Sequence, residues 1–258
     1  MSGARVDLRL DARECGTVAY LTVDNRAKLN TLDRVLMAEF IGAVEALGQR
    51  ADLRALVLAG AGDKAFIGGA NIPEMAALAR DSARDFITLV HRTCDCLRKL
   101  PVPVVAAIDG YALGAGLEVA VSCDLRVAST RAKFGMPEVK VGIPSVVEAA
   151  LIPSLIGYGR ARELLMLGEI VDADTALRWG LIERVVAPEA LDAEVEKIVT
   201  AICAAGAQAV RQQKALMQQW EKLPPDAAIQ AGIDAFARAY ETDEPKRMLS
   251  AFLNRKRD

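Results

Sequence analysis

The sequence contains a single histidine, His91, among its 258 residues. A serine or cysteine hydrolase with a histidine base would have to use this residue, and a metal site with several histidines is excluded. The five cysteines are odd in number and show no CxxC spacing, so they indicate neither a disulfide framework nor a structural zinc site. Carboxylates and backbone groups are therefore left to carry any catalysis, without a metal. We expect His91 itself to have a surface or packing role.

Charge of one sign, aromatic side chains and long apolar runs are also scarce. The 32 basic residues nearly cancel the 34 acidic ones, and the net charge of −2 argues against nucleic-acid binding. The longest stretch without a charged residue has 13 residues, which is too short to span a membrane. The first residues carry charges where a secretion signal needs an apolar core. We therefore expect a soluble, cytoplasmic protein with no membrane or nucleic-acid partner.

Apolar residues make up 52% of the chain, which is enough for a large aliphatic core and excludes intrinsic disorder. The pattern predicts apolar strands at 17–23, 53–59, 104–108 and 125–128, separated by helices at 32–47 and 82–100. Such strands between helices are typical of an α/β fold whose sheet is covered on both faces. We expect a core domain over 1–190.

The last third of the sequence has a different character. Its pattern predicts helices at 188–204, 207–221 and 224–240, followed by a short one that ends before Arg255. These alanine-rich helices cannot all cover one sheet. We therefore expect residues 191–258 to form a helical region that packs elsewhere, for example on another subunit.

Three segments are candidates for the chemistry. The first, 64–73 (KAFIGGANIP), follows a buried strand, and its small residues let a ligand approach the main chain closely. Asn71 followed by Pro73 marks a helix start, where N–H groups without an intrahelical partner can point at an oxyanion. An ordinary glycine-rich turn between a strand and a helix fits the same pattern.

The other two segments each end in a glutamate. Segment 109–118 (DGYALGAGLE) ends in Glu118, and segment 133–138 (KFGMPE) ends in Glu138, with a predicted strand between them. Twenty residues is about the length needed to leave a helix, add a strand and return to the same edge. Two carboxylates beside two backbone donors could bind a thioester carbonyl and handle a water. Unpaired surface glutamates are the alternative.

These segments, taken in order, resemble the motifs of the crotonase superfamily, the enoyl-CoA hydratase/isomerase family, over residues 18–255. The segment from 173 to 186, with A-L-R-W-G-L-I-E-R-V-V, also resembles a family motif. The resemblance implies an α/β fold with a crotonase-type ββα-spiral core. It also implies that 191–258 is a helical trimerisation region that covers the active site, in a homotrimer or a hexamer built as a dimer of trimers.

The chain most resembles an enoyl-CoA hydratase, which adds water syn across the double bond of a trans-2-enoyl-CoA. The resemblance implies that Glu118 deprotonates the water that attacks C3 and that Glu138 protonates C2. It further implies that the N–H groups of Ala70 and Ala115 bind the thioester oxygen. No cofactor is implied, because coenzyme A is part of the substrate. The implied contacts to the acyl-CoA are Arg26, Lys28, Ala65, Phe66, Gly68, Gly69, Asn71, Ile72, Tyr111 and Gly114.

Two departures from the family pattern affect the reaction. Asn71 stands where the family has an aspartate, and 142–148 (GIPSVVE) stands where many hydratases have a glycine-rich segment. Glu148 could be a third catalytic acid. However, Ser145 and Glu148 have the spacing of a capping box, in which each side chain bonds to the backbone N–H of the other residue, and we expect this structural role. A Δ3-Δ2 enoyl-CoA isomerase, another reaction on an unusual acyl-CoA and an inactive acyl-CoA-binding protein stay as alternatives.

Overall fold

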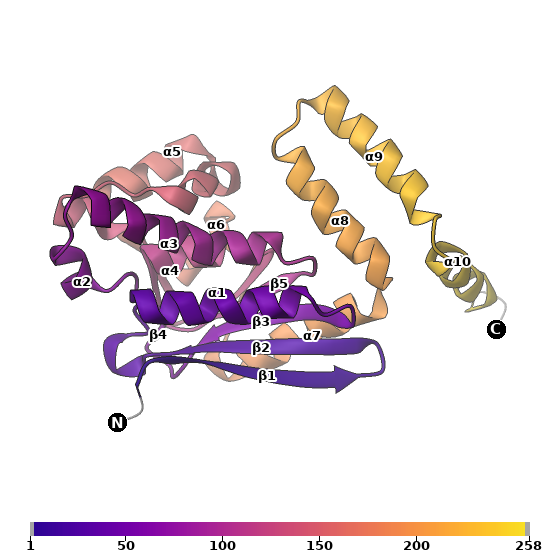
Figure 1. The fold of residues 1–258 in the computed structure, drawn as a ribbon, viewed down its shortest axis with the longest axis horizontal. Helices are drawn as coiled ribbons and strands as arrows, with labels where there is room; N and C mark the ends of the chain where they lie inside the picture. Colours follow the sequence, from indigo (N-terminus) through magenta and orange to yellow (C-terminus); the bar gives the residue numbers. More distant parts are fainter. Residues whose placement is uncertain (1–2, 256–258) are drawn as a thin grey trace.

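The chain folds around two β-sheets, described here from a computed structural model that covers residues 3–255 (Figure 1). The larger sheet has the order β1-β2-β3-β5-β7-β10. Only β1 and β2 pair in antiparallel fashion, and the other neighbours are parallel. Its strands are β1 (Arg5–Arg13), β2 (Gly16–Asp24), β3 (Leu53–Gly60), β5 (Val104–Ile108), β7 (Leu125–Ser129) and β10 (Arg184–Val186).

The smaller sheet has the order β4-β6-β8-β9, with β4, β6 and β8 parallel and β9 antiparallel to β8. Each strand has only three residues, and none of these four strands was predicted from the sequence. Three residues are too few to show a hydrophobic period. The strands are β4 (Ala65–Ile67), β6 (Tyr111–Leu113), β8 (Lys133–Gly135) and β9 (Ile170–Asp172).

One structural unit repeats three times along the chain. In each unit a strand of the larger sheet is followed by a strand of the smaller sheet and then by helix. The units begin at β3, β5 and β7, and this arrangement is the ββα spiral. The predicted α/β fold is therefore confirmed. The helices of the three units are α2 (Ile72–Ala76) and α3 (Arg80–Lys99), then α4 (Ala115–Val121), then the 3₁₀ turns η2 (Pro137–Val141) and η3 (Val147–Leu151) with α5 (Ile152–Leu167).

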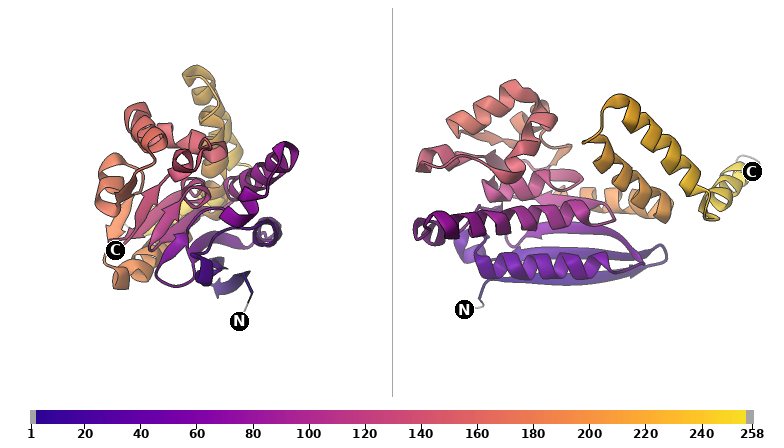
Figure 2. Two further views of the ribbon diagram at one scale, coloured as in Figure 1. Left: turned by 90° about the vertical axis from the view of Figure 1, so that its left-hand side faces the viewer. Right: turned by 45° about the horizontal axis from the view of Figure 1, so that its top comes forward.

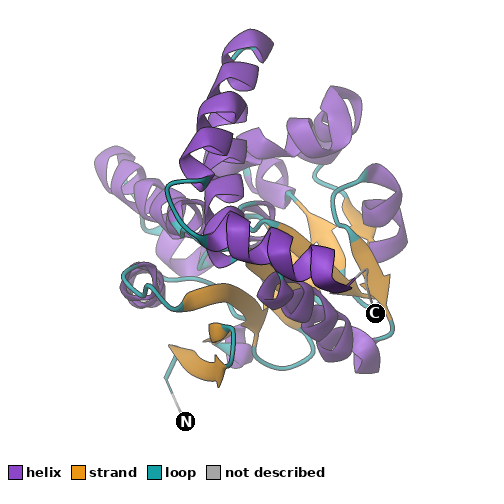
Figure 3. Ribbon diagram, turned by 90° about the vertical axis from the view of Figure 1, so that its right-hand side faces the viewer, coloured by secondary structure: helices purple, strands orange, loops and turns teal. Residues whose placement is uncertain are grey.

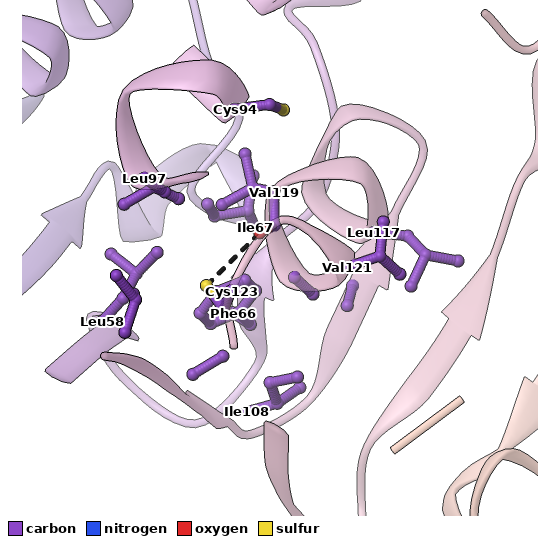
Figure 4. Close-up of a cluster of buried hydrophobic side chains, with 14 of the residues drawn as sticks. Leu58, Phe66, Ile67, Cys94, Leu97, Ile108, Leu117, Val119, Val121 and Cys123 are labelled. Atoms are coloured by element: carbon purple, nitrogen blue, oxygen red, sulfur yellow. Dashed lines mark hydrogen bonds between the residues drawn. The ribbon is translucent and has the colours of Figure 1, made fainter. Parts of the chain in front are cut away.

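The core lies on both faces of the larger sheet, because successive side chains of a strand point to opposite faces. In β3, Leu56 and Leu58 belong to the cluster that packs with α1 (Arg34–Gly48), α3 and α4. Figure 4 shows part of this cluster, where side chains of α3 and α4 meet those of β3 and β4. The alternate residue Val57 belongs to a second cluster, formed with α7 (Leu191–Ala204).

The C-terminal helices divide into one that covers the sheet and three that follow it. α7 packs on the larger sheet. The helical region predicted to begin at residue 191 therefore includes a helix that packs against the core domain. α8 is anchored to the core by the buried Lys214, whose Nζ donates to the Val102 carbonyl at 2.9 Å and to Asp124 Oδ2 at 2.7 Å. The three helices after α7 are α8 (Ala207–Trp220), α9 (Pro225–Ala239) and α10 (Glu244–Arg255), and α6 (Ala173–Trp179) lies before β10.

α9 and α10 extend away from the two sheets. α2 and α5 lie at the opposite end of the molecule (Figure 1, Figure 2), and Figure 3 looks from the side on which α9 and α10 lie. The domain boundary predicted near residue 190 stays a prediction. No helix within residues 3–255 combines the length and the apolar character that crossing a membrane requires.

Candidate active site

A cleft of about 770 Å³ lies where the second and third ββα units meet α2 and α3. Four residues singled out in the sequence as catalytic line it together: Ala70, Ala115, Glu118 and Glu138. Most of the remaining wall is apolar. The other lining residues are Gly68, Gly69, Ile72, Met75, Leu78, Arg80, Ala83, Arg84, Phe86, Ile87, Val90, Leu113, Gly114, Pro137, Lys140, Val141, Ile143, Pro144 and Val146.

The segment after β4 brings one backbone N–H to this cleft. Ala70 forms an isolated parallel bridge with Leu32, in which Leu32 donates to the Gly69 carbonyl and accepts from the N–H of Asn71. In such a bridge the groups of the opposite residue, here Ala70, point away from the partner strand. Gly69 has a φ of +116°, which a residue with a side chain rarely adopts. The glycine therefore sets the turn that exposes the N–H of Ala70.

A second backbone N–H comes from the start of α4. Gly114 precedes the helix with a φ of +51°, and Ala115 is its first residue, whose N–H has no intrahelical partner. A Cβ atom on Gly114 would collide with Oε1 of Glu138, so the glycine allows the carboxylate to approach the helix start. Gly116 has no room for a Cβ against the Ile67 carbonyl. Gly116 therefore allows α4 to lie close to β4.

Glu118 is a buried carboxylate, with only 4% of the residue exposed. Its Oε1 accepts a hydrogen bond from the Ala149 N–H at 3.3 Å. Burial raises the pKa of Glu118 to about 8, and the charges of Glu138 and Glu148 add to this effect, whereas the hydrogen bond from Ala149 opposes it. Glu118 therefore holds a proton at neutral pH far more readily than an ordinary glutamate does.

Glu138 lies in η2, also lines the cleft and is half-buried. Its Oε2 accepts a hydrogen bond from the Ser145 hydroxyl at 2.8 Å. The two catalytic candidates therefore have unlike surroundings, since one is desolvated and the other is held by a hydroxyl. Two carboxylates in unlike surroundings are an arrangement suited to acid–base chemistry.

The capping box predicted for Ser145 and Glu148 is wrong. η3 begins after Val146, and no side chain caps it. The Ser145 hydroxyl donates to Glu138 instead, and Glu148 turns to His91 on α3, with Nδ1 and Oε1 2.7 Å apart. Ser145 bonds to the Glu138 carboxylate and Glu148 to the His91 imidazole in place of the backbone N–H groups of a capping box. Charged partners of this kind form stronger hydrogen bonds than a backbone group does.

The other predicted contacts fall into two groups. Gly68, Gly69, Ile72 and Gly114 line the cleft, whereas the remaining six are not among its lining residues. Ala65 and Phe66 are buried in β4, and the Asn71 side chain caps α2 by accepting from the Glu74 N–H at 3.0 Å. The exposed residues outside the lining are Arg26, which pairs with Asp24 at 2.7 Å, Lys28 in η1 (Arg26–Lys28) and Tyr111.

Sequence reasoning missed two sets of residues. Three basic side chains line the cleft, from Arg80, Arg84 and Lys140, and no motif singled them out. The pairing of His91 with Glu148 was missed because the two residues are 57 positions apart. The polar face of the predicted helix at 82–100 was the only available signal for Arg84.

Comparison with known proteins places these features in a family. Residues 13–258 match the enoyl-CoA hydratase/isomerase family. The chain is 36% identical to the crotonyl-CoA hydratase of Syntrophomonas wolfei, over 93% of both chains. It is 33% identical to the short-chain-enoyl-CoA hydratase of Clostridium acetobutylicum, over 94% of this chain and 93% of that one.

Solved structures show the same likeness. The enoyl-CoA hydratase from Bacillus anthracis superposes with a TM-score of 0.91 at 29% identity, over 96% of both chains. A fold likeness of this extent, together with the family match over nearly the whole sequence, agrees with the ββα spiral described above. The chain therefore belongs to the enoyl-CoA hydratase/isomerase family.

Proposed function

We propose that this protein is an enoyl-CoA hydratase, which adds water syn across the double bond of a trans-2-enoyl-CoA and forms a 3-hydroxyacyl-CoA. The observation that carries the proposal is that Glu118 and Glu138 line one cleft together with Ala70 and Ala115. Hydration needs a base for the water, an acid for C2 and donors for the thioester oxygen. The cleft offers all three.

The thioester oxygen is held by the N–H groups of Ala70 and Ala115. Negative charge grows on this oxygen when water attacks C3, and fixed donors in a water-poor cleft stabilise that charge. Loss of one such donor typically costs about 3–4 kcal/mol of transition-state stabilisation. The methyl group of Ala115 does not interfere, because the contact is made by the backbone.

The two carboxylates share the proton that the reaction moves. Burial favours this proton on Glu118, whose pKa is raised to about 8. When water and substrate bind, the proton passes from Glu118 to Glu138. Glu118 then deprotonates the water that attacks C3, and Glu138 delivers its proton to C2. The number of protons on the pair is the same before and after hydration, so the pair needs one proton throughout.

The rest of the proposal concerns the substrate and its surroundings. The substrate is an acyl-CoA thioester, and no further cofactor takes part. The basic side chains of Arg80, Arg84 and Lys140 at the cleft suit the CoA phosphates, as do Arg26 and Lys28. A reducing compartment such as the cytoplasm suits the chain, because all five cysteines are free thiols. Cell fractionation tests this location.

The proposed assembly is a homotrimer or a hexamer. The support lies in α9 and α10, which extend away from the sheets and leave large apolar side chains exposed. A monomer rarely exposes an apolar patch of this kind. Light scattering coupled to size exclusion measures the assembly. The exposed apolar residues are Ile229, Ile233 and Phe236 on α9, Tyr240 directly after it, and Met248, Leu249, Phe252 and Leu253 on α10.

The test follows loss of the 2-enoyl thioester absorbance with crotonyl-CoA and with longer and branched 2-enoyl-CoAs. We expect the wild type to hydrate at least one of them, and Glu118→Gln and Glu138→Gln each to lower kcat by about a hundredfold or more. A wild type that converts 3-enoyl-CoA but no 2-enoyl-CoA would show an isomerase instead. Binding of CoA thioesters without turnover would show a binding protein.

A further inference from the structure

Glu148 is a buried carboxylate that the proposed mechanism does not use. Only 6% of the residue is exposed, and it is not among the described residues that line the cleft. Its Oε1 lies 2.7 Å from Nδ1 of His91, while its Oε2 is buried and has no hydrogen-bond partner in the described part of the chain. Burying a carboxylate with one oxygen unpaired is unfavourable. Because Glu148 lowers the stability of the fold, its presence at this buried position is better explained by a role in function.

Glu148 is linked to Glu118 through its neighbour in the chain. Ala149, the next residue, donates its N–H to Oε1 of Glu118 at 3.3 Å. The short turn η3 is thereby tied to α3 by a side chain and to α4 by a backbone group. Movement of η3 would move the Ala149 N–H, which is the hydrogen-bond donor to the Glu118 carboxylate among residues 3–255.

The backbone of η3 needs this anchor. Val147 has a φ of +41°, and a β-branched residue with a positive φ is strained. Such a conformation persists only where the surroundings fix it. No side chain caps η3, and among the described residues the bond between His91 and Glu148 is the side-chain hydrogen bond that ties the turn to α3, beside the apolar packing of Val147 and Ala149.

We propose that Glu148, held by His91, is a positioning residue for Glu118, because the pair fixes η3 so that the Ala149 N–H holds the Glu118 carboxylate in the cleft. This inference rests on the proposed function and deepens it. Glu148 does not touch the substrate. Since an ionised carboxylate only accepts hydrogen bonds, His91 carries a proton on Nδ1.

The pair also sets the charge around Glu118. The titratable groups that face Glu118 are Glu138 from η2, Glu148 from η3 and the Cys94 thiol from α3. Burial and the charges of Glu148 and Glu118 raise the pKa of Cys94 far enough to keep the thiol neutral. Glu148 therefore adds a negative charge that disfavours ionisation of Glu118, and removal of that charge has the opposite effect.

The test compares Glu148→Ala and Glu148→Gln with the wild type, using crotonyl-CoA. We expect Glu148→Ala to lower kcat by about 10- to 100-fold with little change in KM, because the substitution displaces the Glu118 carboxylate and leaves the surface that binds the substrate in place. Glu148→Gln keeps an oxygen for the His91 proton, so it should recover most of kcat. Because it lacks the charge, its kcat/KM should begin to fall at a lower pH than in the wild type.

A matched control removes a different ion pair from the same helix. Arg98 on α3 pairs with the exposed Glu221 at 2.5 Å, so Glu221→Gln should change neither kcat nor the pH profile. Thermal unfolding monitors the fold of each variant. The near-isosteric Glu148→Gln decides the question through its pH profile if Glu148→Ala does not fold.

A second measurement does not depend on catalysis. His91 is the only histidine in the sequence, so long-range ¹H–¹⁵N spectra of protein without a histidine tag report its tautomer directly. We expect the Nδ1-protonated form in the wild type and its loss in Glu148→Ala. Unchanged kcat and pH profile in both Glu148 variants would overturn the positioning role. A wild type that hydrates no 2-enoyl-CoA would instead overturn the proposed function, and the spectra would show whether the pair still exists.

Discussion

The shared proton of Glu118 and Glu138 predicts the pH dependence of hydration. The pKa of about 8 that the cleft gives Glu118 marks the loss of the last proton from the pair. Below this pH the pair keeps the proton that C2 receives, and above it both carboxylates are ionised. We therefore expect kcat/KM for crotonyl-CoA to be level near neutral pH and to fall above about pH 8.

The size of the fall follows from a single ionisation. With a pKa of about 8, roughly one tenth of the enzyme keeps its proton at pH 9 and roughly one hundredth at pH 10. The profile of kcat/KM should therefore lose about tenfold per pH unit on its alkaline side. This side is the informative one, because phosphate groups of CoA titrate near pH 6 and affect the acidic side.

The assay measures initial rates well below KM between pH 5.5 and 10 at constant ionic strength. Enzyme held at each pH and then assayed at pH 7 controls for unfolding, and samples without enzyme give the rate of uncatalysed thioester hydrolysis. A value of kcat/KM that stays level or rises up to pH 10 would refute the reasoning. It would mean that no proton on the carboxylate pair is needed.

Three further predictions test single contacts. The pKa of Glu118 is raised from 4.5 to about 8, so the folded protein loses stability as pH rises between these two values. Glutamine has no charge to bury, so Glu118→Gln should increase the free energy of unfolding by about 3 kcal/mol at pH 7 and by almost nothing below pH 4.5. Denaturant titrations at the two pH values measure this difference. Gly114→Ala should lower kcat/KM more than a hundredfold by pushing Glu138 aside, whereas Gly142→Ala, which also has a positive φ but open space around it, should not. Ser145→Ala removes the hydroxyl that donates to Glu138 and should lower kcat about tenfold, a result that an unchanged kcat would contradict.

The sequence predicted four of the six strands of the larger sheet, because these four are mostly buried. It did not predict β1, most of whose residues are not buried, or β10, which has three residues. The strand predicted at 104–108 coincides with β5, and the one predicted at 53–59 differs from β3 by one residue. The smaller sheet escaped prediction because its strands have three residues each, although the segments at 64–73, 109–118 and 133–138 that contain three of them were singled out for their chemistry. In these segments the glycines and glutamates predicted the position of the site, whereas the alternation of apolar and polar residues did not predict the strands.

What the sequence could not give is the set of partners around each carboxylate. The spacing of Ser145 and Glu148 fits a capping box, yet both side chains bind residues that the fold brings from η2 and α3. A local pattern predicts a local bond only when no stronger partner arrives from elsewhere. Buried carboxylates are where this happens most, since each one needs donors that its own segment rarely supplies.

The surroundings of Glu118 combine two opposing effects, and both are useful to the reaction. Burial and the charges of Glu138 and Glu148 favour the protonated form, whereas the Ala149 N–H stabilises the ionised form through Oε1. A carboxylate that must release its proton when water and substrate arrive needs both a raised pKa and a donor already in place for the charge that develops. Because the donor belongs to η3, the proposed anchoring of this turn by His91 and Glu148 is part of how the cleft would prepare Glu118 for its proposed role as a base.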